Sequence, residues 1–371
     1  MSAPVAGLAI AHVTGETGFS GGEVQLFLLM EGLRARGHRC ALICPPGSRS
    51  AERASARGFE TWCVPMRSSA SPLGMWRVAT ALRRCAPELV HLHTGRANWL
   101  GAPAARHLHL PAITTRRMDR PVARGLRTRW LYGPGVARAV AISRAVERRL
   151  LEAGVPRGKI DVIASAVDPA SLQPSRDRRL LRREAGLSDD TVCFLTLASL
   201  DRRKGIDVLL EAVRRLPAEL PICCWIAGDG PERAALERLA GSPELRGRVR
   251  LLGRREDRAD LLALCDALVL PSRREGLGVA ALEAMACARA VVASRVGGLA
   301  EVVVDEGTGL LVPPEEPKAL ADALLRLASE PALRARLGAA GPDRIAQGHL
   351  PEQMSEAYER VYLAVLGERL P

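Results

Sequence analysis

The chain has 371 residues, which fits two domains of ordinary size, and 47% of them are hydrophobic, as in globular proteins. Aromatic residues make up only 3% of the chain, which argues against a protein that binds nucleic acid by stacking bases on aromatic side chains. The net charge of +12 belongs to residues 1–170, which hold 24 Lys and Arg against 11 Asp and Glu, whereas the remainder holds 29 against 30. This one-sided excess indicates a local basic surface.

The sequence shows no sign of secretion or of membrane insertion. The first residues, MSAPVAGLAIAHVTG, lack a basic region and a cleavage site, and they predict a first strand instead of a signal peptide. No apolar run approaches the roughly 18 residues that a spanning helix needs. The nine cysteines are odd in number and lie mostly in apolar runs, which is typical of reduced thiols. We therefore expect a cytoplasmic protein.

Strand-like and helix-like runs alternate along the whole chain. In the first half, strands are predicted at 6–13, 39–46, 88–95, 112–116 and 137–143, with an amphipathic helix at 24–37. The pattern restarts after a segment rich in Pro, Ser and Asp at 165–177, and strands are then predicted at 191–199, 222–230, 249–253, 267–272, 290–294 and 309–314. Alternating β and α units predict parallel sheets with helices on both faces. Because one sheet of about a dozen strands would be very large, we expect two Rossmann-like domains with a cleft between them.

A glycine-rich turn follows the first predicted strand. Gly15, Gly18, Gly21 and Gly22 lie in VTGETGFSGGEVQ, just before the first helix. Free N–H groups at a helix start attract anions, and glycine lets a phosphate approach the backbone closely. The segment is neither a Walker A loop nor a GxGxxG fingerprint, so a flexible turn without a ligand is the alternative.

A basic turn follows the first strand of the second half. Arg202, Arg203 and Lys204 stand between this strand and its helix, at a place where cations suit a diphosphate. A solvated charged loop is the alternative for such a turn taken alone.

The segment PSRREGLGVAALEAMA combines carboxylates with glycines. Glu275 lies in the turn after a buried strand, so its side chain and the N–H groups of Gly276, Leu277 and Gly278 can all bind hydroxyls. Glu283 lies about one and a half turns into the next helix. It can accept hydrogen bonds from a ribose diol, or it can be an exposed helix residue.

Glu275 and Glu283, separated by seven residues within PSRREGLGVAALEAMA, resemble the signature of the retaining glycosyltransferase family 4. The resemblance covers nearly the whole chain. SGGEVQLFLLMEGLRARGH resembles the family's first loop and helix, and RKGIDVLLEAV, IAGDGPERAALERLA and GGLAEVVVDEGTGLLVPP resemble its C-terminal domain in order and spacing. It implies an α/β protein of the GT-B fold, with two doubly wound Rossmann-like domains facing a central cleft. The acceptor-side domain is expected at 1–168, the nucleotide-sugar domain at 169–351, and a last helix at about 352–371 that crosses back to the first domain.

The family implies transfer of a sugar from a nucleoside diphosphate sugar to a hydroxyl of a cell-envelope glycan or lipid-linked acceptor. A UDP-sugar is favoured over GDP-mannose and ADP-heptose. By this resemblance Gly21 and Gly22 approach the donor phosphates, Arg203 and Lys204 hold the diphosphate, Glu275 with the amides of Gly276, Leu277 and Gly278 holds the sugar, and Glu283 holds the ribose. Neither a metal nor another cofactor is expected, in keeping with the lack of an Asp-x-Asp pair.

His91 and His93 lie on the same side of one predicted strand. We assign His91 to the core. We place His93 in the catalytic set with Glu275, Lys204 and Arg203, because ligands bind at the carboxyl ends of parallel strands. As a zinc pair the two histidines lack partners.

At two places near the expected site the chain departs from the family. Ser199 stands where the family often has an arginine, five residues before Lys204, so another arginine of the basic turn has to replace it. Arg116, Arg117 and Asp119 stand where many members carry a histidine. We take these three residues as acceptor-side candidates.

Residues 116–149 carry ten arginines against Asp119 and Glu147. Within this range RPVARGLRTRWLYG, at 120–133, would as a helix set arginines around an apolar stripe, as interfacial helices do. It predicts peripheral binding to the anionic inner face of the plasma membrane, and the alternative is that the apolar residues pack inward.

Two other functions are compatible with parts of the sequence. One is a different GT-B enzyme, such as a sugar-nucleotide epimerase or a phosphorylase. The other is a basic protein that binds nucleic acid, against which the aromatic content and the one-sided charge both argue.

Overall fold

The computed structural model describes residues 7–18 and 20–367. The chain divides into two compact units, one ending at Ala166 and resuming at Pro351, and the other running from Val167 to Leu350. We call them the N-unit and the C-unit. The sequence placed the boundary after residue 168 and the return at about 352. Ala6 of the expected first strand, Phe19 of the glycine-rich turn and residues 368–371 of the expected last helix lie outside the described residues.

The N-unit is built on a parallel sheet in the order β3-β2-β1-β4-β5-β6-β7. Its strands are β1 (Ala9–Val13), β2 (Arg39–Cys44), β3 (Glu60–Cys63), β4 (Leu89–Leu92), β5 (Ala112–Arg116), β6 (Arg138–Ala141) and β7 (Ile160–Val162). The chain runs outward from β1 in one direction and from β4 in the other. The strand order therefore reverses between β1 and β4, where parallel α/β sheets bind their ligands.

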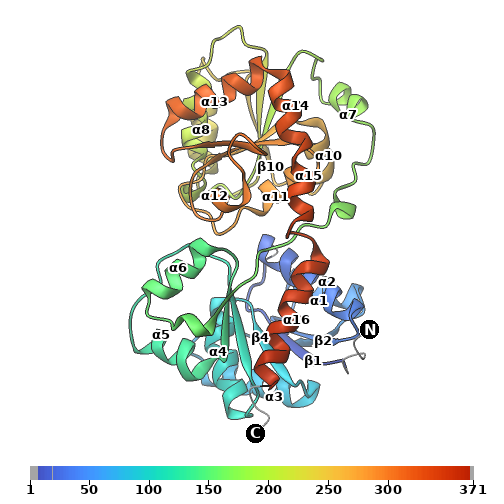
Figure 1. Cartoon of the computed structure of the whole chain (residues 1–371), viewed down its shortest axis with the longest axis vertical. Helices are drawn as coiled ribbons and strands as arrows, with labels where there is room; N and C mark the ends of the chain where they lie inside the picture. Colours follow the sequence, from blue (N-terminus) through green and yellow to red (C-terminus); the bar gives the residue numbers. More distant parts are fainter. Residues whose placement is uncertain (1–6, 19, 368–371) are drawn as a thin grey trace. The chain divides into compact units, whose positions relative to one another are not determined.

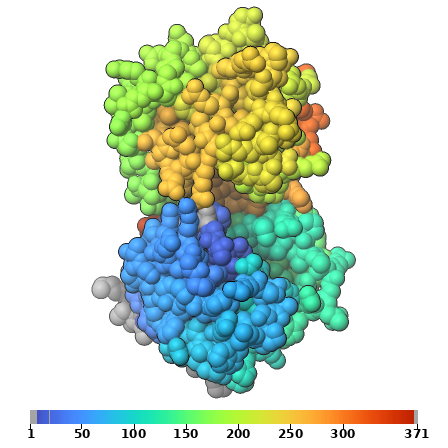
Figure 2. Space-filling view, turned by 180° about the vertical axis from the view of Figure 1, so that it is seen from behind, coloured from blue at the N-terminus to red at the C-terminus, as the bar shows by residue number. Residues whose placement is uncertain are grey.

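Helices cover both faces of this sheet, as right-handed crossovers require when the strand order reverses. They are α1 (Gly21–Ala35), α2 (Arg49–Ala56), α3 (Pro72–Cys85), α4 (Gly95–His107), α5 (Leu126–Trp130), α6 (Arg144–Glu152) and α16 (Pro351–Gly367), with a π-helix η1 (Leu131–Gly135) after α5 and a short 3₁₀ helix η2 (Arg157–Lys159). α3 packs against α4, and α16 (red in Figure 1) packs along α1. Figure 2 shows the other side of the unit, where the blue and cyan surface of the early segments dominates.

The last helix completes the core of the N-unit. Tyr358 and Tyr362 of α16 are almost fully buried, and they belong to the same apolar cluster as Leu26 and Met30 of α1. At the helix surface Glu359 pairs with Arg36 and with His38, whose Nε2 lies 2.7 Å from the carboxylate. α16 is thus an integral part of the N-unit, although its residues follow the whole C-unit in sequence.

The C-unit is built on a second parallel sheet in the order β10-β9-β8-β11-β12-β13. Its strands are β8 (Val192–Leu197), β9 (Ile222–Ala227), β10 (Val249–Gly253), β11 (Ala267–Leu270), β12 (Ala290–Ser294) and β13 (Gly309–Val312). The order reverses between β8 and β11. A cluster of buried hydrophobic side chains that includes Phe194, Val269 and Val292 fills the space between this sheet and its helices.

The helices of the C-unit again follow the strands in alternation. They are α7 (Arg178–Glu184), α8 (Ile206–Arg214), α9 (Arg233–Ala240), α10 (Arg258–Leu264), α11 (Val279–Ala286), α12 (Leu299–Val302), α13 (Pro317–Ser329), α14 (Pro331–Ala339) and α15 (Gly341–Ala346), with short turns η3 (Pro169–Leu172) and η4 (Arg202–Lys204). α13 packs on α8 and α15 on α11 (Figure 1).

The expected interfacial helix at 120–133 is wrong in extent. Residues 120–125 are not helical, and the helix begins only at Leu126, after an extended Gly125; α5 then continues directly into the π-helix η1. Leu131 and Tyr132 point into the core, whereas Leu126 is 82% exposed. Strands β3 and β7 were not predicted either, since both are short strands at the sheet edges whose side chains are only partly buried. Among the described residues no helix is both long enough and apolar enough to cross a membrane.

Candidate active site

The glycine-rich turn of the N-unit leads into a well-capped helix. The Ser20 hydroxyl accepts a hydrogen bond from the N–H of Gly22 at 3.3 Å, and the Glu23 carboxylate accepts one from the N–H of Ser20 at 2.9 Å. This reciprocal pair is a capping box, which fixes the first turn of the 15-residue helix α1. Gly21 and Gly22 therefore stand at the start of a helix that follows β1, beside the point where the strand order reverses.

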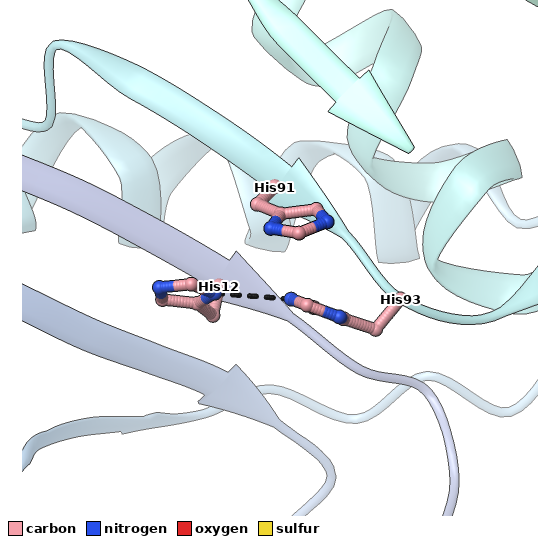
Figure 3. A group of neighbouring side chains, drawn as sticks. All are labelled: His12, His91 and His93. Atoms are coloured by element: carbon pink, nitrogen blue, oxygen red, sulfur yellow. Dashed lines mark hydrogen bonds between the residues drawn. The ribbon is translucent and has the colours of Figure 1, made fainter. Parts of the chain in front are cut away.

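Three buried histidines meet at the same place (Figure 3). His12 comes from β1 and lies opposite His91 of β4 in the parallel pairing, and His93 follows the end of β4. His12 Nδ1 and His93 Nε2 are 3.0 Å apart. His91 hydrogen-bonds the hydroxyls of Tyr362 at 2.8 Å and Thr115 at 2.7 Å. His12 was not singled out in the sequence, although its position in the first strand, next to the glycine-rich turn, is a usable signal.

The three histidines are neutral at physiological pH. Burial, aided by the nearby charge of Arg117, lowers the pKa of His12 to about 3. Burial also holds the pKa values of His91 and His93 well below the ordinary value, with further contributions from the neighbouring rings and Arg117. His93, which the sequence placed in the catalytic set, thus belongs to a neutral hydrogen-bonded network, and His91 is the core residue expected.

The nitrogens of His12, His91 and His93 lie within 4.8 Å of one another, close enough to share a metal ion. Their arrangement suits a metal poorly. The rings of His91 and His93 overlap with centroids 3.9 Å apart, and both nitrogens of His91 are engaged by hydroxyls. The adjacent Arg117 adds a positive charge that would repel a cation. We therefore interpret the cluster as a hydrogen-bond network.

The structure separates the three acceptor-side candidates. Asp119 is buried and accepts a hydrogen bond from Arg149 at 2.7 Å, so its charge is already compensated within the N-unit. Arg116 donates to the carbonyl of Arg120 at 2.6 Å. Arg117 points to the histidines, and its Nη2 is 3.5 Å from His93 Nδ1. Arg117 is therefore the candidate that lies at the reversal point of the sheet.

In the C-unit, the basic turn η4 and the Glu275 turn come together where β8 and β11 end. Lys204 Nζ donates to Glu275 Oε2, and Arg203 Nη1 lies 3.6 Å from Glu275 Oε1. Ser272 adds a hydroxyl 3.3 Å from the same carboxylate. The sequence predicted these residues as one site, and the structure brings Arg203, Lys204 and Glu275 into direct contact.

Three further contacts hold the two turns against each other. The N–H of Arg273 donates to the carbonyl of Arg203 at 2.8 Å. Gly205 has a φ of 65°, and a Cβ there would lie 2.0 Å from the carbonyl of Pro271, so no larger residue fits. The Arg273 guanidinium lies 2.7 Å from Asp207 and hydrogen-bonds it, which lowers the pKa of that carboxyl. The two turns that carry Arg203, Lys204 and Glu275 are therefore held together by backbone and side-chain contacts.

The amides that follow Glu275 are placed by a second close approach. Gly278 has a φ of 96° and begins the path into α11, and a Cβ on it would lie 2.4 Å from Leu299. The N–H of Gly298 donates to the Glu275 carbonyl at 3.2 Å. Gly276, Leu277 and Gly278 thus form a tight turn against the start of α12.

Glu283 lies in α11 and is buried. Its Oε1 accepts a hydrogen bond from Arg258 Nη1 at 2.6 Å. Burial raises the pKa of Glu283, and the charge of Arg258 opposes this effect. Arg258 is a residue that the sequence did not point to, since it lies 25 positions away in the segment after β10. The predicted ribose contact of Glu283 would be made by a carboxylate that an arginine already orients.

Comparisons with known proteins agree with this geometry. Residues 177–344 match the family described as "Glycosyl transferases group 1", and residues 19–171 match "Glycosyltransferase Family 4". The two matches fall on the C-unit and mainly on the N-unit, respectively.

Proteins with similar sequences are named as glycosyltransferases. A D-inositol 3-phosphate glycosyltransferase of Kineococcus radiotolerans is 31% identical over 76% of this chain and 72% of that protein. The lipopolysaccharide core biosynthesis glycosyltransferase LpsD of Rhizobium meliloti is 29% identical over 92% of this chain and 94% of that protein. The chain spans 59% and 64% of two further curated relatives that it matches.

A solved structure with the same fold is that of HepE from Anabaena, in complex with UDP and glucose. It has a TM-score of 0.85 and 20% sequence identity, and the match covers 96% of this chain and all of that one. The two parallel sheets and this likeness confirm the fold class predicted from the sequence. The chain belongs to glycosyltransferase family 4 and has the GT-B fold.

Proposed function

We propose that the protein is a retaining glycosyltransferase that moves a sugar from a nucleoside diphosphate sugar to an acceptor hydroxyl. The observation that carries the proposal is the cluster of Arg203, Lys204 and Glu275 at the reversal point of the C-unit sheet. It combines two cations, which suit a diphosphate, with a carboxylate and adjacent amides, which suit sugar hydroxyls.

Each residue of the C-unit site then has a separate role. Arg203 and Lys204 stabilise the negative charge that grows on the departing diphosphate, which is electrostatic catalysis. Glu275 and the amides of the glycine turn orient the donor sugar. Glu283, fixed by Arg258, accepts hydrogen bonds from the ribose.

The reaction proposed needs neither a metal nor a covalent enzyme intermediate. The leaving phosphate oxygen accepts the acceptor proton on the face from which it departs, so the configuration at the sugar is retained. Arg203 and Lys204 take the part that a divalent cation plays in other diphosphate chemistry. These roles for the two cations and for the leaving phosphate are proposed from the family resemblance and from the presence of the two cations in the site.

UDP is the proposed nucleotide, and a cell-envelope glycan or lipid-linked molecule is the proposed acceptor. HepE, which shares the fold, is described in complexes with UDP and with UDP-glucose. Among the relatives, LpsD is named for lipopolysaccharide core biosynthesis. GDP-mannose and ADP-heptose are the donors to test next.

The test is a product assay with a panel of UDP-, GDP- and ADP-sugars and lipid-linked and soluble acceptors. We expect one donor to give a new glycoside by mass spectrometry, with the anomeric configuration of the donor by NMR. The yield should be unchanged in EDTA. Inversion would contradict the retaining mechanism, dependence on a divalent ion would contradict the metal-free one, and donor consumption without any glycoside would favour an epimerase or hydrolase instead.

We also propose that the N-unit binds an anionic membrane surface, where a lipid-linked acceptor would be found. Leu126 is 82% exposed and lies beside Arg127 and Arg129, which are exposed too. Trp76 of α3 is 59% exposed. Although the long helix expected at 120–133 is not formed, basic and apolar groups still occur together on the short helix α5. Such a combination is what interfacial segments use.

Liposome flotation checks this second proposal. We expect binding to anionic vesicles at low salt, release at about 0.5 M salt because the Debye length shrinks to a few ångströms, and loss in the variant Arg127→Glu/Arg129→Glu. The matched control is Arg179→Glu/Arg183→Glu on α7 of the C-unit, which makes the same charge change on another exposed helix. Equal binding to neutral and anionic vesicles would contradict the proposal.

A further inference from the structure

Two cysteines lie opposite each other at one edge of the N-unit sheet. Cys44 and Cys63 are the last residues of β2 and β3, and the parallel register pairs one with the other. The N–H of Val64 donates to the Cys44 carbonyl at 2.8 Å, so the two strands stay paired to their ends. Paired residues of neighbouring strands point to the same face of a sheet, and the strands are about 4.8 Å apart. Disulfides join residues whose Cα atoms are about 4.4–6.8 Å apart, so the two positions can be bridged.

The two thiols interact but differ in their access to solvent. The Cys44 thiol donates a hydrogen bond to Cys63 Sγ, and the Ser48 hydroxyl donates one to Cys44 Sγ. Cys44 is fully buried, and burial raises the pKa of its thiol to about 12, whereas Cys63 is exposed. Cys63 is therefore the thiol that a dissolved oxidant meets, and Cys44 lies directly behind it. An accessible cysteine beside a second, resolving cysteine is typical of redox-sensitive sites.

A second pair of opposed cysteines lacks these properties. Cys193 of β8 is paired in register with Cys223 of β9, and their side chains also hydrogen-bond each other. Both are buried, and each of these strands has a neighbouring strand on both sides. β3 is instead an edge strand of four residues, which can adjust its end to the geometry that a disulfide needs. We therefore expect Cys193 and Cys223 to stay reduced under conditions that oxidise the pair in the N-unit.

The end of β2 is hydrogen-bonded to the glycine-rich turn. The N–H of Thr14 donates to a carbonyl of β2 at 3.0 Å, and the N–H of Arg49 donates to the Thr17 carbonyl at 3.4 Å. Ser48, which donates to Cys44 Sγ, is also the N-cap of α2. A disulfide turns the Cys44 sulfur toward β3 and away from this hydroxyl. Its formation would therefore displace the segment on which the glycine-rich turn rests.

We propose that Cys44 and Cys63 form a redox-modification site whose disulfide slows the enzyme. The oxidant is a low-molecular-weight disulfide. Cys63 Sγ attacks one of its sulfur atoms, the S–S bond of the oxidant breaks, and one thiol leaves. Cys44 Sγ then attacks Cys63 Sγ and displaces the second thiol. The two cysteines are oxidised, the oxidant is reduced to two thiols, and these thiols take up the two protons.

The first measurement is a peptide map of the full chain after reduction and incubation with glutathione disulfide. The remaining thiols are blocked with N-ethylmaleimide in denaturant, and the digest is examined by mass spectrometry. We expect a cross-link between the peptides of Cys44 and Cys63, with Cys193 and Cys223 recovered as blocked thiols. Cys44→Ser should stop at the mixed disulfide of Cys63 with glutathione, and Cys63→Ser should give no cross-link. Cys287→Ser changes a half-buried cysteine outside the pair and is the matched control.

The second measurement is the initial rate of glycosyl transfer before and after the same incubation. We expect oxidation to slow the wild type and Cys287→Ser at least about fivefold, because small displacements of positioning groups are costly to catalysis. Dithiothreitol should restore the rate. Cys63→Ser should keep its rate under oxidation, since the oxidant has no accessible thiol of the pair to attack.

Either of two results would overturn the inference. One is an oxidised wild type without the Cys44–Cys63 cross-link, or with an equal amount of a Cys193–Cys223 cross-link. The other is an unchanged rate in protein that carries the Cys44–Cys63 disulfide. Only the effect on the rate rests on the proposed function. A protein that transfers no sugar in either redox state would contradict that function, and the peptide map would still report directly on the disulfide.

Discussion

Glu275→Ala is expected to lower glycosyl transfer by at least about 10³-fold, because the carboxylate no longer accepts two or three hydrogen bonds from the sugar hydroxyls. The carboxylate is buried and held by Lys204 and Ser272, so its position is fixed before a sugar binds. Steady-state kinetics with the donor found in the product assay measures the effect on kcat. Activity near that of the wild type would remove Glu275 from the site.

Stability has to be separated from catalysis in this experiment. Glu275→Ala removes the carboxylate partner of Lys204 and one of the two carboxylates that Arg203 pairs with, Asp201 being the other, which is expected to lower the Tm. In the double variant Lys204→Ala/Glu275→Ala one of these cations is gone, and we expect much of the Tm to return. Transfer should remain abolished in the double variant, which shows that the loss is not due to unfolding.

Lys204→Ala is expected to weaken the binding of UDP by about 10- to 100-fold while changing the binding of uridine less than about threefold, since a charge-assisted bond to phosphate is lost. The loss of the ion pair with Glu275 adds to the loss of UDP affinity. Without Lys204, the Glu275 carboxylate has lost its closest cation and repels the diphosphate. Calorimetry with both ligands tests this.

The double variant Lys204→Ala/Glu275→Ala tests whether Glu275 repels the diphosphate once Lys204 is gone. If repulsion by Glu275 contributes, the double variant binds UDP more tightly than Lys204→Ala alone, so the two substitutions are not additive. An equal loss of affinity for UDP and uridine would show that Lys204 does not contact the diphosphate. Arg214→Ala on the far end of α8, where the side chain pairs with Glu211 at 2.9 Å, is the control.

The fold class was predictable from the sequence because buried parallel strands read as continuous apolar runs. The predicted strand AVVAS coincides with β12, and the predicted strand ALVLPS contains β11; both strands are fully buried. β3, with the sequence ETWC, escaped detection since an edge strand of four residues buries little. The helix at 120–133 was overestimated because an apolar and basic composition was given more weight than Pro121 and Gly125, which both interrupt helices.

The candidate site was predictable where its residues are close in sequence or belong to one motif. Arg203 and Lys204 lie in one turn and Glu275 in another; the family resemblance placed the two turns together, and they are in contact. The role of Arg258 as the partner of Glu283, and the meeting of His12 with His93, depend on which strand ends become neighbours in the sheet. The order of the strands in the sheet determines which strand ends are neighbours, and no local sequence pattern predicts this order. For the same reason Asp119 could not be recognised as the partner of Arg149.

The position of α16 has a consequence for synthesis on the ribosome. The C-unit is a continuous stretch whose two ends are tied together by the N–H of Val167, which donates to the His349 carbonyl at 2.9 Å. It can therefore be completed as soon as Leu350 has left the exit tunnel. The N-unit began earlier but lacks Tyr358 and Tyr362 of its core until α16 emerges. Domains usually fold in the order in which they are made, and here the unit translated first is the one that is finished last.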